Sequence, residues 1–199
     1  MAWVWQVKSL RGVNLIMKSG VLTRETVLQQ AETIVAQHGF SKLTYNGLAR
    51  QCGVKPQSLY RYVDNIADVK SGVISLYIQQ LTANIASQLT EDTGKTALLH
   101  GGVLFLTQTQ MGISFADMVA GIVEFGENQQ VRAALNDLRD MFGQYIEQVT
   151  TDPSQLEMNK RLYFEMCIGN IALFNTSTFP VDKGVQILQQ NLKRVLELF

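Results

Sequence analysis

The stretch TYNGLARQCGVKPQSLYRYV, residues 44–63, decides the fold of this chain. Two short helical patterns flank a turn at Gly53. The second pattern opens with Pro56, which suits the first turn of a helix because no amide hydrogen is needed there. Leu59 and Val63 lie four residues apart, so both point to the same inward face. This arrangement predicts a helix-turn-helix, a motif that places its second helix in the DNA major groove.

Helix signals continue on both sides of this stretch. Upstream, Thr23 can cap a helix that ends at Gly39, because glycine readily takes the left-handed conformation there. Downstream, Asn65 and Asp68 start a long fourth helix that runs to about Leu89. No segment alternates convincingly as a strand, so we predict an all-α fold of about nine helices. The five further helices are expected at about 95–109, 114–120, 127–150, 153–175 and 182–198.

The chain divides into an extension, a small domain and a larger helical domain. We expect these at residues 1–17, 18–65 and 66–199, with the second boundary inside the fourth helix rather than in a linker. The extension is rich in apolar residues but lacks the charge pattern and cleavage site of a signal peptide. We expect it to lie outside the main fold, with Met17 as an alternative translation start.

Charge is unevenly distributed along a chain whose net charge is zero. Residues 18–65 carry six lysines and arginines against three acids, about +3, whereas residues 66–199 carry nine against fourteen, about −5. The small domain can therefore meet phosphates while the larger one stays away from them. No apolar run of the roughly 20 residues that span a bilayer is present. We expect a cytoplasmic location and no membrane partner.

Residues for catalysis or metal binding are sparse. Cys52, Cys167, His38 and His100 are isolated, and none has the spacing of a metal site or a catalytic triad. Two free thiols suit a reducing compartment. We therefore expect no enzyme activity, no cofactor and no metal.

The outward face of the second helix of the motif carries DNA-reading side chains. Gln57 and Arg61 can pair bidentately with adenine and guanine edges, and tyrosine or serine hydroxyls can donate to phosphate oxygens. The start of the first helix offers free amides to another phosphate. The expected DNA-contacting residues are Thr44, Tyr45, Lys55, Gln57, Ser58, Tyr60, Arg61 and Tyr62.

These segments resemble the DNA-binding domain of the tetracycline-repressor (TetR) family of bacterial regulators. The resemblance rests on AETIVAQHGFSKLT (31–44), LARQCGV (48–54) and SLYRYV (58–63). It implies three DNA-binding helices joined through the long fourth helix to a helical ligand-binding and dimerisation domain. It also implies a homodimer on double-stranded DNA with a palindromic operator, and an unidentified small-molecule effector.

Three positions depart from the family pattern. Lys55 stands where the family commonly has a serine or threonine cap, Val63 where many members have phenylalanine, and Ile66 where many have a phosphate-contacting lysine. The last change should weaken non-specific affinity for DNA modestly. We therefore keep open an alternative, a helical dimeric interaction protein of the same fold with weakened or lost DNA binding.

Two apolar stripes near the C-terminus favour a dimer interface. Their spacings of three and four residues are those of a heptad seam, and two helices from each subunit would form a four-helix bundle. The open alternative is that both stripes face the core of the chain itself. The stripe residues are Met158, Leu162, Met166, Gly169, Leu173, Val185, Leu188, Leu192, Val195 and Phe199.

The middle of the chain is rich in methionine and aromatic residues, which adapt to cavities for small apolar ligands. Ordinary core packing is the alternative for each of them. The candidate pocket residues, including polar ones that could orient a ligand, are His100, Phe105, Gln108, Met111, Phe115, Met118, Phe125, Met141, Tyr145, Phe164 and Asn170. No charged cluster marks an ionic effector. We expect a transcriptional repressor that a small hydrophobic or weakly polar effector releases from its operator.

Overall fold

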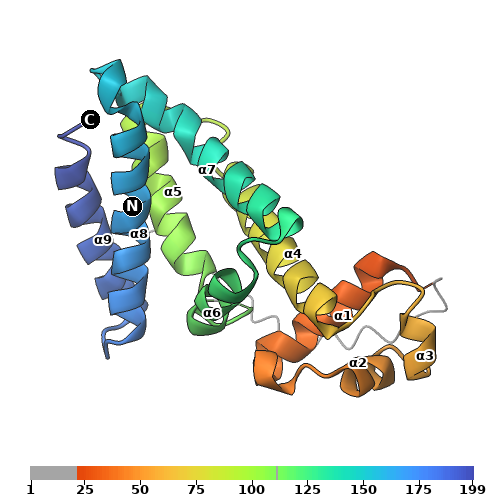
Figure 1. Ribbon diagram of the computed structural model, residues 1–199. Coiled ribbons are helices and arrows are strands. Elements are labelled where there is room, and N and C mark those ends of the chain that lie inside the picture. Colours follow the sequence, from red (N-terminus) through yellow and green to blue (C-terminus); the bar gives the residue numbers. More distant parts are fainter. Residues whose placement is uncertain (1–21, 111) are drawn as a thin grey trace.

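The computed structural model describes residues 22–110 and 112–199 (Figure 1). The expected extension at 1–17 and the candidate pocket residue Met111 lie outside these residues. Within them the chain forms nine α-helices and two 3₁₀ turns, and no strand. The predicted all-α fold is confirmed. The helices are α1 (Arg24–His38), α2 (Tyr45–Gln51), α3 (Pro56–Leu59), α4 (Ile66–Ala86), α5 (Gly94–Gln108), α6 (Phe115–Phe125), α7 (Gln129–Val149), α8 (Leu156–Asn175) and α9 (Val181–Val195), and the turns are Phe40–Lys42 and Pro153–Gln155.

Side-chain caps fix where the first helices begin. The Thr23 hydroxyl accepts a hydrogen bond from the Thr26 amide at 3.2 Å, and the Thr26 hydroxyl accepts one from the Thr23 amide at 2.9 Å. The Thr44 hydroxyl accepts from the Gly47 amide at 3.1 Å, and Asn65 accepts from two amides of the first turn of α4. Each cap satisfies amides that have no partner within the helix.

Helices α1, α2 and α3 pack into a small unit at one end of the molecule (Figure 1). Its core includes Val27, Ala31, Leu48 and Leu59, none of which is exposed to solvent. Gly53 connects α2 to α3 with φ = 67°, a left-handed conformation that favours glycine. The turn therefore has the geometry that the sequence predicts.

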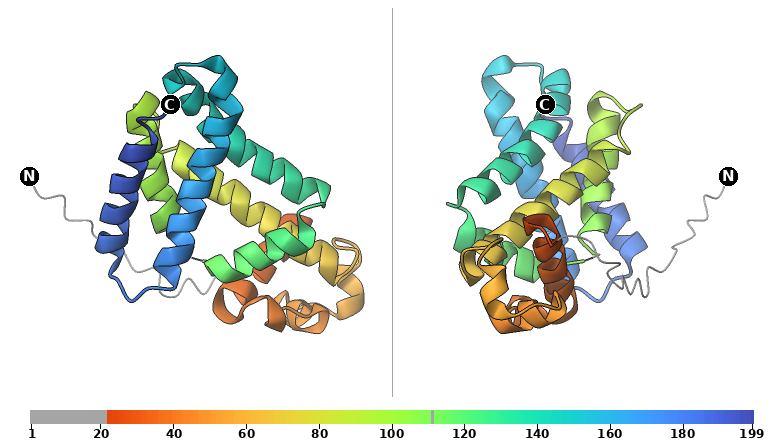
Figure 2. Two further views of the ribbon diagram at one scale, coloured as in Figure 1. Left: turned by 60° about the vertical axis from the view of Figure 1, so that its left-hand side comes forward. Right: turned by 90° about the vertical axis from the view of Figure 1, so that its right-hand side faces the viewer.

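Helix α4 contacts both parts of the molecule. It packs against α1 at one end and against α7 along much of its length (Figures 1 and 2). Close approach to α1 is possible because a Cβ at Gly72 would lie only 2.7 Å from the Leu28 side chain. One continuous helix therefore connects the α1–α3 unit to the C-terminal part.

The C-terminal part is organised around α5. This helix packs against α7, α8 and α9, and α8 and α9 lie side by side (Figure 2). Phe142 of α7 and Tyr163 of α8 are fully buried, and their rings lie 5.2 Å apart. The Tyr163 hydroxyl donates a 2.8 Å hydrogen bond to the carbonyl of Leu98 in α5.

Some helix boundaries differ from the predicted ones. Helix α3 ends at Leu59, and the Tyr62 and Val63 amides then turn back to the Leu59 carbonyl. Helix α6 runs to Phe125, beyond the expected end near residue 120, because Gly121 lets it pack closely on Ile74 of α4. No helix among the described residues is long and apolar enough to cross a membrane.

Candidate functional site

Helix α3 and the turn after it present polar side chains to solvent. Gln57, Tyr60 and Arg61 are exposed, and Tyr60 retains 63% of its accessible surface. Leu59 and Val63 are buried, as the four-residue spacing predicts. The buried Leu59 and Val63 anchor this segment to the core, while the hydrogen-bonding groups of its exposed face remain available to a ligand.

The start of α3 has no side-chain cap. Lys55 occupies the capping position, is exposed and makes no capping hydrogen bond. Pro56 has no amide hydrogen, and the Ser58 amide donates to the Lys55 carbonyl at 2.9 Å, so α3 begins without needing a side-chain cap. Ser58 and Tyr62, the two other expected contact residues on this segment, are partly buried.

Tyr45 of α2 has a structural role that the sequence did not reveal. Its hydroxyl donates a 3.2 Å hydrogen bond to the Val63 carbonyl, and its ring lies 4.9 Å from that of Tyr60. Thr44 next to it is exposed, but its hydroxyl already accepts the bond from Gly47. Tyr45 thereby supports residues 56–63, called the recognition segment below, which comprise α3 and the turn after it.

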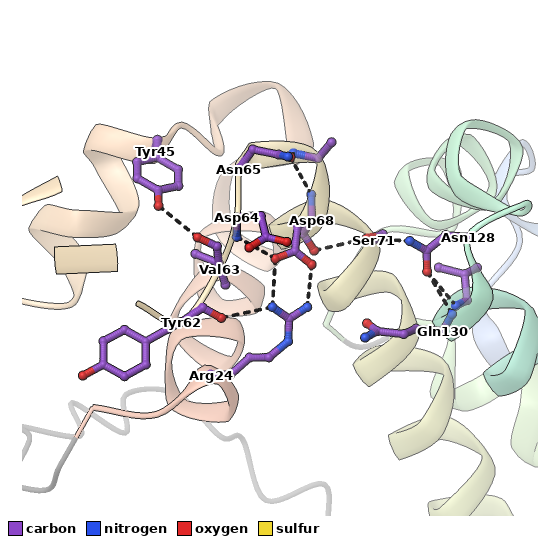
Figure 3. Close-up of polar contacts among 12 residues, drawn as sticks. Arg24, Tyr45, Tyr62, Val63, Asp64, Asn65, Asp68, Ser71, Asn128 and Gln130 are labelled. Carbon is purple, nitrogen blue, oxygen red and sulfur yellow. Dashed lines mark hydrogen bonds and ion pairs between the residues drawn. The ribbon is translucent and has the colours of Figure 1, made fainter. Parts of the chain in front are cut away.

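Arg24 is a functional candidate that sequence reasoning missed (Figure 3). Its guanidinium donates to the Tyr62 carbonyl at 3.1 Å and pairs with both carboxylate oxygens of Asp68 at 2.8 and 2.5 Å. The Asp68 carboxylate also accepts from the Asp64 amide at 2.9 Å. The hydrogen bonds from Arg24 hold the pKa of Asp68 below its ordinary value. A contact across 44 residues leaves no local pattern in the sequence.

Comparison with known proteins agrees with this geometry. Residues 27–69, which include most of α1 and all of α2 and α3, match the family model described as "Bacterial regulatory proteins, tetR family".

The helix-turn-helix unit, residues 27–69, belongs to the tetR family.

This match supports a DNA-binding regulator, and the described residues of both units form helices and no strands. It is similar to the nucleoid occlusion factor SlmA of Idiomarina loihiensis, with 22% identity over 173 residues that cover 86% of each chain. This similarity extends well beyond the helix-turn-helix.

Solved structures share the fold. A putative TetR-family transcriptional regulator from Rhodococcus sp. superposes with a TM-score of 0.70 at 13% identity, over 87% of this chain and 97% of that one. BioQ, solved with its double-stranded DNA operator, superposes with a TM-score of 0.58 at 17% identity, over 89% and 95% of the two chains. At such identities these likenesses describe the architecture alone.

An apolar cavity of about 120 Å³ lies between α4, α5, α6, α7 and α8. Four of the expected pocket residues line it: Phe105, Phe115, Met118 and Phe164. Arg139 is the charged residue in its lining. The remaining lining residues are Ile78, Leu81, Val119, Ile122, Leu135, Leu138 and Ile168.

The other expected pocket residues lie elsewhere. The His100 imidazole is 2.6 Å from the Asp92 carboxylate near the surface, and Asn170 lines a separate hollow between α8 and α9. Gln108 lines a polar hollow beside Glu32 and Tyr77. These three are corrections to the predicted lining, because helix rotation turns their side chains away from the cavity. Phe125, Met141 and Tyr145 are half-buried against the core and do not line the cavity.

The two apolar stripes have different surroundings. Leu188, Leu192, Val195 and Phe199 are buried within the chain, so a surface seam along them is a correction to the prediction. The cause is that α9 packs on α5, where a Cβ at Gly102 would lie 2.5 Å from Leu192. Val185 is half-buried against the same core.

The stripe on α8 faces outward. Met158 and Leu173 retain 62% and 73% of their accessible surface, and Gly169 has open space around it. Leu162 and Met166 between them are half-buried. This stripe remains available to a second chain.

Among the residues that the structure describes, no group of three or more metal-ligating side chains gathers. Cys52 and Cys167 are both buried free thiols. Burial raises the pKa of Cys167 to about 12, so this thiol stays neutral.

Proposed function

We propose that this protein is a homodimeric, effector-responsive transcriptional repressor. The observation that carries the proposal is the structural link between an exposed helix-turn-helix and an apolar cavity. Helix α4 packs against α1 at one end, and it contributes Ile78 and Leu81 to the cavity. Occupancy of the cavity therefore acts on the element that orients the DNA-binding unit.

The DNA contacts that we propose divide by chemistry. Gln57 and Arg61 read base edges, since their side chains are exposed and can bond bidentately. Lys55, Ser58, Tyr60 and Tyr62 serve the phosphates. Thr44 and Tyr45 lie at the start of α2, which faces the DNA backbone, so that the helix amides there attract a phosphate. We assign these roles to residues 18–65, and effector binding and dimerisation to residues 66–199.

The dimer interface that we propose is centred on α8. Burying the exposed stripe of Met158, Leu173 and their neighbours against a second copy removes apolar surface from water. Phe179 lines one hollow together with Leu173, and Val181 at the start of α9 is also exposed. A two-fold axis there would place the recognition helices in half-sites one helical turn apart, about 34 Å.

The effector that we propose is a small apolar molecule with one polar or anionic group. Aromatic and aliphatic side chains make up the cavity wall, and the Arg139 guanidinium can orient a single acceptor. Arg139 itself bonds only to the Asn136 amide oxygen, at 3.3 Å, among the described residues. Repression ends if the effector binds more tightly to a conformer whose recognition helices no longer match the operator.

A cavity-filling variant tests the link without knowledge of the effector. Val119 is 39% exposed at the cavity, whereas Val123 on the same helix is 82% exposed and does not line it. We expect Val119→Trp, which imitates occupancy, to weaken operator binding in a gel shift with the chain's own upstream DNA. Val123→Trp should leave the shift unchanged. Equal binding by both variants would contradict the proposed link.

A second candidate function comes from the relatives. The similarity to nucleoid occlusion factor SlmA covers 86% of each chain and thus both units of the fold. We therefore keep a role in nucleoid occlusion as the alternative. Expression in cells that lack their own factor separates the two: restored exclusion of septa from the nucleoid supports the alternative, while control of a promoter reporter alone supports the repressor.

A further inference from the structure

The recognition segment depends on outside support for its orientation. Helix α3 has only four residues, and so short a helix has little stability of its own. Two side chains from other helices hold consecutive carbonyls just beyond it. Tyr45 donates to the Val63 carbonyl at 3.2 Å, and Arg24 donates to the Tyr62 carbonyl at 3.1 Å.

Arg24 is itself held by the first turn of α4 (Figure 3). The Arg24 guanidinium donates to both carboxylate oxygens of Asp68, and this bidentate geometry fixes the plane of the guanidinium. Asp68 is anchored in turn by the Asp64 amide, and the amide of Asp68 bonds to the Asn65 side chain. One guanidinium thus joins α1, the end of the recognition segment and the start of α4.

The same turn of α4 also reaches the effector-binding part. The Ser71 hydroxyl donates to the Asp68 carbonyl at 3.1 Å and accepts from the Asn128 side chain at 3.4 Å. Asn128 caps α7, the helix that brings Leu135, Leu138 and Arg139 to the cavity. A contiguous path of polar contacts therefore runs from the start of α7 to the Tyr62 carbonyl.

We propose that Arg24 is a positioning residue for sequence-specific DNA recognition, because it sets the orientation of Arg61 and Tyr62 relative to α4. The inference rests on the DNA-contact roles proposed above. A lysine cannot replace Arg24, since one ammonium cannot hold both carboxylate oxygens and the carbonyl in a planar fork. Arg24 itself makes no phosphate contact in this account.

The test measures affinity for two duplexes by fluorescence anisotropy. One duplex is selected by the wild-type protein from a random pool, and the other is a scrambled sequence of the same composition. We expect Arg24→Ala to lower the ratio of specific to non-specific affinity about tenfold. The salt slope should stay unchanged, because it follows the charged phosphate contacts and Lys55 is retained. Arg24→Lys should retain most of the thermal stability yet keep a reduced ratio.

Arg132→Ala is the matched control, since it removes another arginine–carboxylate pair, with Glu127, that contacts neither Arg24 nor Asp68. This control should change neither the ratio of specific to non-specific affinity nor the salt slope. Three results for Arg24→Ala would overturn the inference. They are an equal loss of specific and non-specific affinity, an unchanged ratio of the two affinities, and a salt slope reduced by about one. Recovery of the full ratio by Arg24→Lys would also overturn it. If the wild-type protein selects no sequence at all, the proposed function fails first.

Discussion

At the scale of single residues, every fully buried side-chain nitrogen or oxygen in the described part of the chain has a hydrogen-bond partner. Tyr163 is fully buried, and its hydroxyl reaches the Leu98 carbonyl. Asn159, also buried, donates to the Thr150 hydroxyl at 3.2 Å. Such contacts fix the rotation of α8 against α5 and α7. They could not be predicted from the sequence, because each joins residues whose separation follows from the packing of whole helices.

Removing the Tyr163 hydroxyl should destabilise the fold measurably. We expect Tyr163→Phe to lower the free energy of unfolding by about 1 kcal/mol, since one buried hydrogen bond is lost. Urea denaturation followed by circular dichroism measures the change. Tyr145→Phe, at a half-buried position, should stay within about 0.5 kcal/mol of the wild-type protein. Equal effects would show that the Leu98 contact contributes nothing particular.

The Arg24–Asp68 pair predicts a dependence of stability on pH. The pKa of Asp68 is lower in the folded than in the unfolded protein, because Arg24 donates to its carboxylate. Its contribution to stability is therefore complete above the unfolded pKa of about 4, and it is lost as the pH falls through the folded pKa. Asp68→Asn should lower the melting temperature at pH 7, and the gap to wild type should narrow below pH 4. A constant gap across this range would contradict the assignment.

At the scale of elements, local signals predicted helix starts well. Thr23, Thr44 and Asn65 cap the helices that their positions predict, since a cap depends only on its neighbours in sequence. The stripes on α8 and α9 were harder to interpret. An apolar stripe shows that one face of a helix is covered, and it does not say whether the same chain or a second copy covers it. Leu188 and Leu173 have similar sequence settings and opposite surroundings.

Paired substitutions on α8 and α9 test this distinction. Leu188→Ala creates a cavity in the core and should cost about 2–5 kcal/mol in unfolding free energy. Leu173→Asp should leave the fold of each subunit intact but weaken the dimer, because a charge would enter the proposed interface. Sedimentation equilibrium and thermal melting measure the two effects. A dimer unaffected by Leu173→Asp would exclude an α8-centred interface.

At the scale of the whole molecule, the chain joins the proposed DNA-reading surface to an apolar cavity without a linker. The outward face of α3 could be predicted from the sequence, because the burial of Leu59 and Val63 determines it. Four residues of the cavity were predicted and others were misplaced, because His100, Gln108 and Asn170 are close to the lining in sequence but face other surroundings. Helix rotation, which depends on long-range packing, decides such cases.

The central claim is that Arg61 on the exposed face of the recognition segment reads DNA sequence. The most direct measurement is the affinity of the wild-type protein and of Arg61→Ala for the selected and scrambled duplexes across a range of salt concentrations. We expect wild-type affinity to fall steeply with salt, and Arg61→Ala to lose about 1–3 kcal/mol of specific binding while it still binds the scrambled duplex. Two results would contradict the account: a wild-type affinity that does not change with salt concentration, or an Arg61→Ala variant with unchanged affinity for the selected duplex.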